Sequence, residues 1–177
     1  IPTLGVWSAG QDIDFENLPD SFILKCNHNS GTGMVICKDK SKLNIPKVRS
    51  GLAAGLRENY YLNNREWPYK NVKRRIIAEQ YMEDDSFHYL RDFKFFCSYG
   101  KVYALFIATG RNLGEHETRF DFYDENFKHL PFTNGHPNAT DTPEKPATFE
   151  EMKNIASILS ADIPNARIDL YEINGKV

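Results

Sequence analysis

The sequence has 177 residues, of which 41% are hydrophobic and 13% aromatic, and its formal net charge is −2. This composition is typical of a globular protein rather than a disordered one, and the length allows one domain or two small lobes. A net charge so close to zero gives no global reason to expect nucleic acid or an anionic membrane as a partner, although charge can still be concentrated locally.

The sequence predicts a cytoplasmic protein with reduced thiols. Its longest apolar runs, such as 103–108, are far shorter than the roughly 20 residues that a transmembrane helix requires. No secretion signal is visible at the start of the chain. The three cysteines, Cys26, Cys37 and Cys97, are odd in number and widely spaced, which favours buried free thiols over a disulfide framework or a zinc site.

A short hairpin is predicted after an extended lead-in over residues 1–20. Apolar and polar residues alternate over 22–27, which indicates a strand with Lys25 on its second face, and 34–37 is the returning strand. The polar turn NHNSGTG between them could cradle an anion with its backbone N–H groups. On spacing alone a plain hairpin loop is favoured, because the turn lacks the ending of a P-loop.

An amphipathic helix is predicted within residues 46–64. Its apolar stripe repeats at four-residue intervals, at Val48, Leu52, Leu56 and Tyr60. Gly51 and Gly55 weaken the helix locally, and each is expected to permit close packing. The stretch 65–75 that follows is polar, aromatic and basic, and Pro68 predicts a loop there.

The remainder of the chain predicts mainly strands. They are 76–82, 93–97, 102–109, 120–124 and a last strand in the segment ARIDLYE. One helix is expected to begin at Thr148, with Glu151 completing a capping box. The order of these elements predicts an α+β fold with mostly antiparallel pairing.

Several charged residues lie within the predicted strands. Glu79 interrupts an apolar strand, where a carboxylate needs a cationic partner or a ligand. Arg167 and Asp169 share one strand face, so they could hold a metal-bound phosphate or pair with each other. The same two interpretations apply to Asp92 and Lys94.

Five segments of the sequence follow one another in a characteristic order: LPDSFILKCNHNSG, REWPYKNVKRRIIAEQYMEDD, LRDFKFFCSYGKV, RFDFYDENFKHLPF and ARIDLYEINGKV. Over nearly the whole chain they resemble the TupA-like branch of the ATP-grasp superfamily. The combination of LK-x-NH-x-SG, EWPYK, RIIAE-x-Y and D-x-KFFC is specific to that branch. The resemblance implies an ATP-grasp fold whose lobes hold ATP between antiparallel sheets, with 1–82 as the lid-like lobe and 83–177 as an incomplete second lobe.

The resemblance also implies roles for individual residues. Lys25 would reach the nucleotide phosphates, Lys94 would be a second basic residue of the cleft, and Arg119 and Arg167 would clamp phosphates. The loop that closes over the phosphates would include Asn27, His28, Ser30 and Gly31. Glu79 would be the hinge acid, and the residues at the adenine and ribose would be Tyr81, Met82 and Asp84 or Asp85.

The implied reaction is an ATP-dependent ligation. A carboxylate of a sugar or amino-acid substrate attacks the γ-phosphate of ATP bound with Mg²⁺, for which Asp169 would be the first ligand, and an amine displaces the acyl phosphate. Members of this branch are encoded among genes for capsule and teichuronopeptide synthesis. Because some members are labelled glycosyltransferases, a sugar transferase is one alternative, and a degenerate, non-catalytic nucleotide-binding fragment is another.

The resemblance finally implies that parts of a complete ATP-grasp protein are missing from this sequence. A preATP-grasp portion would precede Ile1, and a second metal-binding acid would follow Val177. One carboxylate holds magnesium with too few oxygens for efficient transfer. The expectation for the 177-residue chain alone is therefore weak nucleotide binding or no activity.

Overall fold

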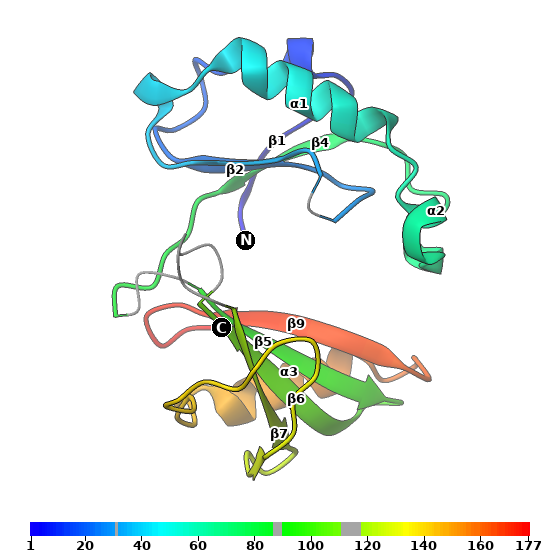
Figure 1. Cartoon of the computed structure of the whole chain (residues 1–177), viewed down its shortest axis with the longest axis vertical. Helices are drawn as coiled ribbons and strands as arrows, with labels where there is room; N and C mark the ends of the chain where they lie inside the picture. The colour runs from blue at the N-terminus through cyan, green and yellow to red at the C-terminus, as the bar shows by residue number, and fades with distance from the viewer. Residues whose placement is uncertain (31, 87–89, 111–117) are drawn as a thin grey trace. The chain divides into compact units, whose positions relative to one another are not determined.

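Two antiparallel sheets, each covered on one face by a helix, form the framework of the protein (Figure 1). The computed structural model describes residues 1–30, 32–86, 90–110 and 118–177. Its two compact units are Ile1–Tyr81 and Met82–Val177. The mixed architecture confirms the predicted α+β class. Among the described residues, no helix is long and apolar enough to cross a membrane.

The first unit is a four-stranded sheet in the order β1-β4-β2-β3. Its strands are β1 (Thr3–Trp7), β2 (Phe22–Cys26), β3 (Met34–Cys37) and β4 (Ile76–Gln80). The helices are α1 (Ile45–Arg57), which lies over the sheet in Figure 1, and the short α2 (Tyr61–Asn64). Three 3-10 turns are η1 (Gly10–Asp12), η2 (Lys40–Lys42) and η3 (Trp67–Tyr69).

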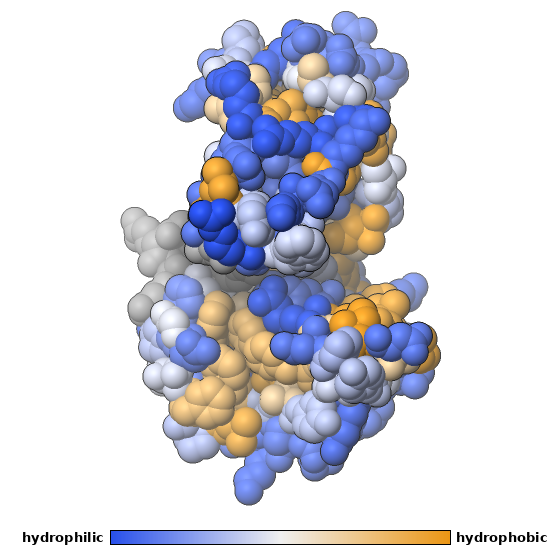
Figure 2. Space-filling model, turned by 90° about the vertical axis from the view of Figure 1, so that its right-hand side faces the viewer, coloured by the Kyte–Doolittle hydropathy of each residue, from blue (hydrophilic) through white to orange (hydrophobic). Residues whose placement is uncertain are grey.

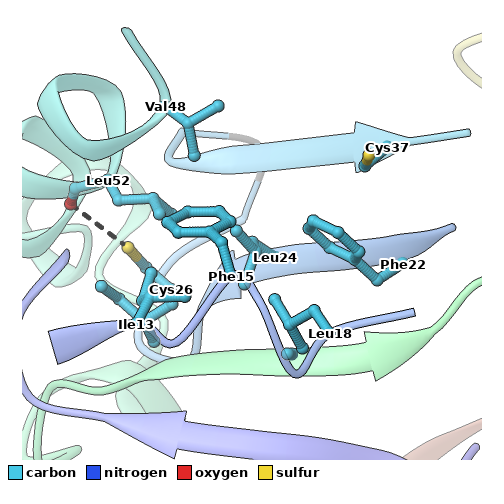
Figure 3. Packing of buried hydrophobic residues seen from close by; sticks show 11 residues of the cluster. Ile13, Phe15, Leu18, Phe22, Leu24, Cys26, Cys37, Val48 and Leu52 are labelled. Atoms are coloured by element: carbon cyan, nitrogen blue, oxygen red, sulfur yellow. Dashed lines mark hydrogen bonds between the residues drawn. The ribbon is translucent and has the colours of Figure 1, made fainter. Parts of the chain in front are cut away.

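Alternation along β2 decides which of its side chains enter the core. Phe22, Leu24 and Cys26 are buried on the face toward α1, where Val48 and Leu52 of the helix meet them (Figure 3). This is the period-two pattern of a strand packed against the four-residue stripe of a helix. The thiol of Cys26 also lies 3.7 Å from the carbonyl oxygen of Leu52.

The turn after β2 packs tightly against α1. A Cβ atom on Gly55 would lie 2.8 Å from Cα of Gly33 and 3.0 Å from Sγ of Cys26, closer than real Cβ contacts. The predicted close packing is therefore confirmed at Gly55. It is wrong at Gly51, since a Cβ atom there would meet nothing within 4 Å.

The second unit is a five-stranded sheet in the order β8-β7-β6-β5-β9. Its elements are β5 (Arg91–Ser98), β6 (Lys101–Thr109), β7 (Arg119–Asp124), β8 (His129–Leu130), α3 (Phe149–Leu159) and β9 (Ala166–Glu172). Phe93 and Phe95 of β5 pack with Phe149 and Met152 of α3. All three cysteines of the chain are free and buried, as predicted.

Some local expectations were wrong. The lead-in contains strand β1. Its alternation of apolar and polar residues is interrupted by a glycine and by a register shift between Thr3 and Gly5, so the sequence pattern did not reveal the strand. The first helix ends at Arg57 because Glu58 is already extended. Thr148 is the N-cap of α3 but makes no capping bond. Its hydroxyl instead donates to Oε1 of Glu172 at 2.7 Å, so the capping box does not form.

Candidate functional site

The sheet of the first unit carries an ion pair on the face away from α1. In the antiparallel register, Lys25 lies opposite Met34 on one side and Ile77 on the other, while Glu79 lies opposite Ile23. Residues directly opposite each other share a face. The large hydrophobic side chains that are exposed on these strands are Leu4, Val6, Met34 and Ile36. This face is thus an apolar surface with charge at its centre.

Lys25 and Glu79 form that charged centre. Nζ of Lys25 is 2.7 Å from Oε1 of Glu79, and the two side chains are 40% and 16% exposed. The pair explains how an apolar strand tolerates a carboxylate. Because the Lys25 side chain is partly exposed to water, the pair contributes only about 0–1 kcal/mol of stability, so its ammonium can turn toward an anionic ligand at low cost.

The loop after β2 is anchored at its base. The side chain of Asn27 accepts from the N–H of Arg75 at 2.8 Å and donates to the carbonyl of Lys73 at 3.0 Å. The buried ring of His28 donates through Nε2 to the carbonyl of Glu58 at 3.1 Å. These bonds hold the start of the loop against the rest of the unit.

The tip of the same loop differs from its base. Ser30 is exposed, and Gly31 lies outside the described residues. Gly33 returns the chain to β3 with φ of +70°, a conformation that suits glycine. Asn27 and His28 therefore position the loop, and Ser30 is presented to solvent.

A second charged cluster lies on the sheet of the second unit, on the face away from α3. Lys94 lies between two carboxylates, with Nζ 2.7 Å from Oδ2 of Asp92 and 2.5 Å from Oδ2 of Asp169. Arg167 donates to both oxygens of Asp169, at 2.8 and 3.0 Å. Two cations and two carboxylates thus form one neutral network, which joins the two residue pairs that the sequence left open.

The protonation state of Asp169 follows from this network. Its burial by itself disfavours the charged form. The hydrogen bonds and charges of Arg167 and Lys94 outweigh burial, so the pKa of Asp169 lies below its ordinary value. Asp169 is therefore a carboxylate at neutral pH, with two cations attached.

Aromatic residues occupy the same face beside the charged cluster. Phe106 of β6 lies 4.7 Å from Phe120 and 5.2 Å from Phe122 between ring centroids, and 5.8 Å from Phe96. Phe122 is buried with Phe106 in a small hydrophobic cluster separate from the one that packs against α3, and Phe120 packs against it. Figure 2 shows hydrophobic side chains gathered on this unit.

The other predicted residues have various surroundings. Arg119 precedes Phe120 on β7, so its side chain lies on the opposite face of the sheet, the face toward α3 and away from Arg167. Its guanidinium donates to the carbonyl of Asn138 at 3.2 Å. The Tyr81 ring packs under the ammonium of Lys38, with 5.3 Å between nitrogen and centroid. Met82 is half-buried. Oδ2 of Asp85 accepts from Asn174 at 2.9 Å.

Sequence reasoning did not identify a cavity of about 560 Å³ in the second unit. Arg91, Asp84, Thr109 and Glu172 line it, and Arg91 donates to Oε2 of Glu172 at 2.5 Å. Glu172 lies on the strand face toward α3, so a buried ion pair forms part of the wall. Strand pattern alone could not reveal the cavity, because its lining comes from segments far apart in the chain.

The described residues do not by themselves supply a full set of magnesium ligands. Among them no group of three or more histidine, cysteine, aspartate or glutamate side chains could hold a metal ion. Mg²⁺ requires near-octahedral oxygen coordination, usually from carboxylates, phosphates and water. In Asp169 the carboxylate oxygens already accept from Lys94 and Arg167, so this residue alone does not fit the ion.

Comparison with known proteins gives one match. A family model described as TupA-like ATPgrasp covers residues 1–177. No curated protein and no solved structure matches the chain. ATP-grasp proteins bind nucleotide and generally use ATP with Mg²⁺. The full-length match, together with the two α+β units, shows that the chain belongs to the TupA-like ATP-grasp family.

Proposed function

We propose that this protein is an ATP-dependent carboxylate ligase of cell-surface polysaccharide or teichuronopeptide biosynthesis, acting in the cytoplasm. The observation that carries the proposal is the partly exposed Lys25, which pairs with Glu79 on a sheet face that also exposes large hydrophobic side chains. The purine ring of a nucleotide binds to an apolar surface. The phosphates of the nucleotide bind to a cation, and a lysine in a weak ion pair can make this contact at low energetic cost. Membership of the ATP-grasp family is the reason for proposing a nucleotide as the ligand of this surface.

The proposed chemistry needs no nucleophilic side chain. A carboxylate of a sugar or amino acid attacks the γ-phosphorus of ATP, the bond to the bridging oxygen breaks, and ADP leaves. An amine then attacks the acyl carbon of the resulting acyl phosphate and releases phosphate. Catalysis of this kind is mainly positioning and charge neutralisation. We assign the neutralisation to Lys25, Lys94 and Arg167. Arg119 lies on the opposite face of the sheet from Arg167, so it is assigned no contact with the same phosphates.

The remaining roles in the proposal concern the nucleotide base and ribose. Backbone groups at Tyr81 and Met82 would meet the adenine edge after the acid Glu79, and Asp85 would meet the ribose. Ser30 and Gly31 would belong to the loop that closes over the phosphates. Because both oxygens of Asp169 accept from Lys94 and Arg167, Asp169 is not assigned as a magnesium ligand and no step is assigned to the ion.

The glycosyltransferase alternative receives little support. Asp12 and Asp14 do have the DxD spacing found in nucleotide-sugar transferases. However, Asp14 accepts from the side chain of Asn17 at 2.6 Å and from the backbone N–H of Glu16 at 3.1 Å. These bonds are those of a local turn, which accounts for Asp14 without a ligand.

Calorimetric titration with ATP in the presence of Mg²⁺ tests nucleotide binding. Lys25→Ala is expected to weaken affinity about tenfold to a hundredfold, the value of a hydrogen bond to a charged group. Lys42→Ala is the matched control, because Lys42 forms a similar 2.7 Å pair with Asp39 on the same unit and should bind ATP normally. Absence of binding in the wild-type protein, or equal affinity in all three proteins, contradicts the proposal.

Ligase chemistry requires a separate test. Hydroxylamine traps an acyl phosphate as a hydroxamate, so the protein is incubated with ATP, Mg²⁺, hydroxylamine and a panel of sugar acids and amino acids. Hydroxamate that depends on ATP and on one of these acids supports the ligase. ATP binding without any hydroxamate favours the non-catalytic nucleotide-binding alternative.

A further inference from the structure

We infer that the first unit carries a docking surface for anionic lipid bilayers. The surface, called here the basic-aromatic patch, is made by α2, η3 and the residues that follow them. Its members are Tyr61, Leu62, Arg65, Trp67, Lys70, Lys73 and Arg74. The inference does not depend on the reaction proposed above.

Charge is concentrated in this region. Residues 57–75 contain six lysines or arginines and two glutamates, a net charge of +4 in a chain whose formal net charge is −2. Arg65, Lys70, Lys73 and Arg74 are all exposed. A local excess of this kind attracts an anionic partner even where the protein as a whole is acidic.

Large apolar groups are exposed among these cations. The side chain of Trp67 is 67% exposed and that of Leu62 is 53% exposed. Nζ of Lys70 lies 4.4 Å from the ring centroid of Trp67 and 5.4 Å from that of Tyr61, while Arg65 lies 5.7 Å from the Tyr61 ring. Aromatic rings and positive charges therefore belong to one surface.

Side-chain contacts hold this surface in place. Tyr60 and Tyr69 pack edge to face with centroids 4.9 Å apart, which joins the start of α2 to the end of η3. The guanidinium of Arg74 donates to the carbonyl of Leu56 at 2.8 Å. The side of the first unit on which α2 lies in Figure 1 faces the viewer in Figure 2, where the surface of this unit is mostly hydrophilic with scattered hydrophobic side chains.

This combination fits a bilayer better than a nucleic acid. Tryptophan prefers the interface between lipid and water, and lysine and arginine near the surface are attracted by anionic headgroups. An exposed leucine gains from contact with the acyl region, whereas nucleic-acid phosphates are bound by charged and polar groups. Among the described residues no helix could span a membrane, so the contact would be peripheral.

Vesicle co-sedimentation tests the inference. The full chain is mixed with phosphatidylcholine vesicles, with or without phosphatidylglycerol, at low and high ionic strength. Binding is expected only to the anionic vesicles and is expected to weaken with salt. The double variant Trp67→Ala/Lys70→Glu is expected to bind at least about tenfold more weakly, since each cation near the surface contributes about fivefold.

A matched control lies in the second unit. Lys101 stacks on the exposed ring of Tyr103 with 4.8 Å between nitrogen and centroid, so Tyr103→Ala/Lys101→Glu removes the same chemistry outside the patch. This control is expected to bind as the wild type does, and thermal unfolding should show that both variants are folded. Equal binding to neutral vesicles, equal loss in both variants, or binding to a single-stranded oligonucleotide but to no vesicle would overturn the inference.

Discussion

Nζ of Lys25 on β2 and Oε1 of Glu79 on β4 are 2.7 Å apart on the sheet face of the first unit that lies away from α1. Neither residue is fully buried, and the strands that carry them are far apart in the sequence. The pair therefore stabilises the strand pairing weakly while presenting an ammonium group to solvent. Its strength can be measured.

A double-mutant cycle on Lys25→Met and Glu79→Gln is expected to give a coupling energy below about 1 kcal/mol, because the ammonium is partly in water. The free energy of unfolding is measured by urea denaturation for the wild type, both single variants and the double variant. A coupling of several kcal/mol would mean that Lys25 is held too firmly by Glu79 to serve a ligand.

Gly55 and Gly51 provide a contrast within one helix. Gly55→Ala is expected to lower the free energy of unfolding by about 1–3 kcal/mol, since the new Cβ atom overpacks against the Gly33 backbone. Gly51→Ala, at an exposed position with open space, is expected to raise it by about 0.5–1 kcal/mol through helix propensity. Chemical denaturation of both variants decides the matter, and equal effects would argue against the close approach of the loop to α1.

Asp169 should titrate below its ordinary pKa of 3.8, because burial is outweighed by Arg167 and Lys94. A depressed carboxyl pKa contributes stability that is present above the unfolded value and is lost as pH falls through the folded value. Carboxyl carbon NMR measures the midpoint directly. In Arg167→Gln the pKa of Asp169 should move upward, and an unchanged midpoint would show that the arginine does not influence it.

The pKa of Tyr123 is expected to be shifted upward, so this residue affects stability at alkaline pH rather than at acidic pH. Burial, followed by the charge of Asp121, raises its pKa to about 12, and its hydroxyl donates to the carbonyl of Pro143 at 2.8 Å. The raised folded pKa contributes stability that is complete below pH 10 and is lost as pH rises toward 12.

Ultraviolet difference titration should therefore show a late tyrosine transition that is absent in Tyr123→Phe. This variant should also lose about 1 kcal/mol of stability at neutral pH, the net value of the hydrogen bond. A variant that keeps the late transition would assign it to another tyrosine.

Particular residues show how far the sequence could predict the site. The sequence identified four charged residues as candidates for the site, because a charged residue within a predicted strand needs a partner. They are Lys25, Glu79, Lys94 and Asp169. Which partners they have depends on strand register, since Lys94 meets Asp169 only because β5 and β9 pair antiparallel at that position. The proposed roles of these residues toward a nucleotide remain predictions.

The sequence by itself determined the α+β class and the buried faces of the strands and helices, because the burial of side chains follows the local periods of strand and helix. Only the tertiary structure decided that β1 joins the first sheet, that Phe120 and Phe122 lie apart from the main core, and that the hydroxyl of Thr148 serves Glu172 rather than its own helix. Each of these features depends on contacts between segments that are distant in the chain. Such contacts produce no periodic pattern in the sequence of either segment.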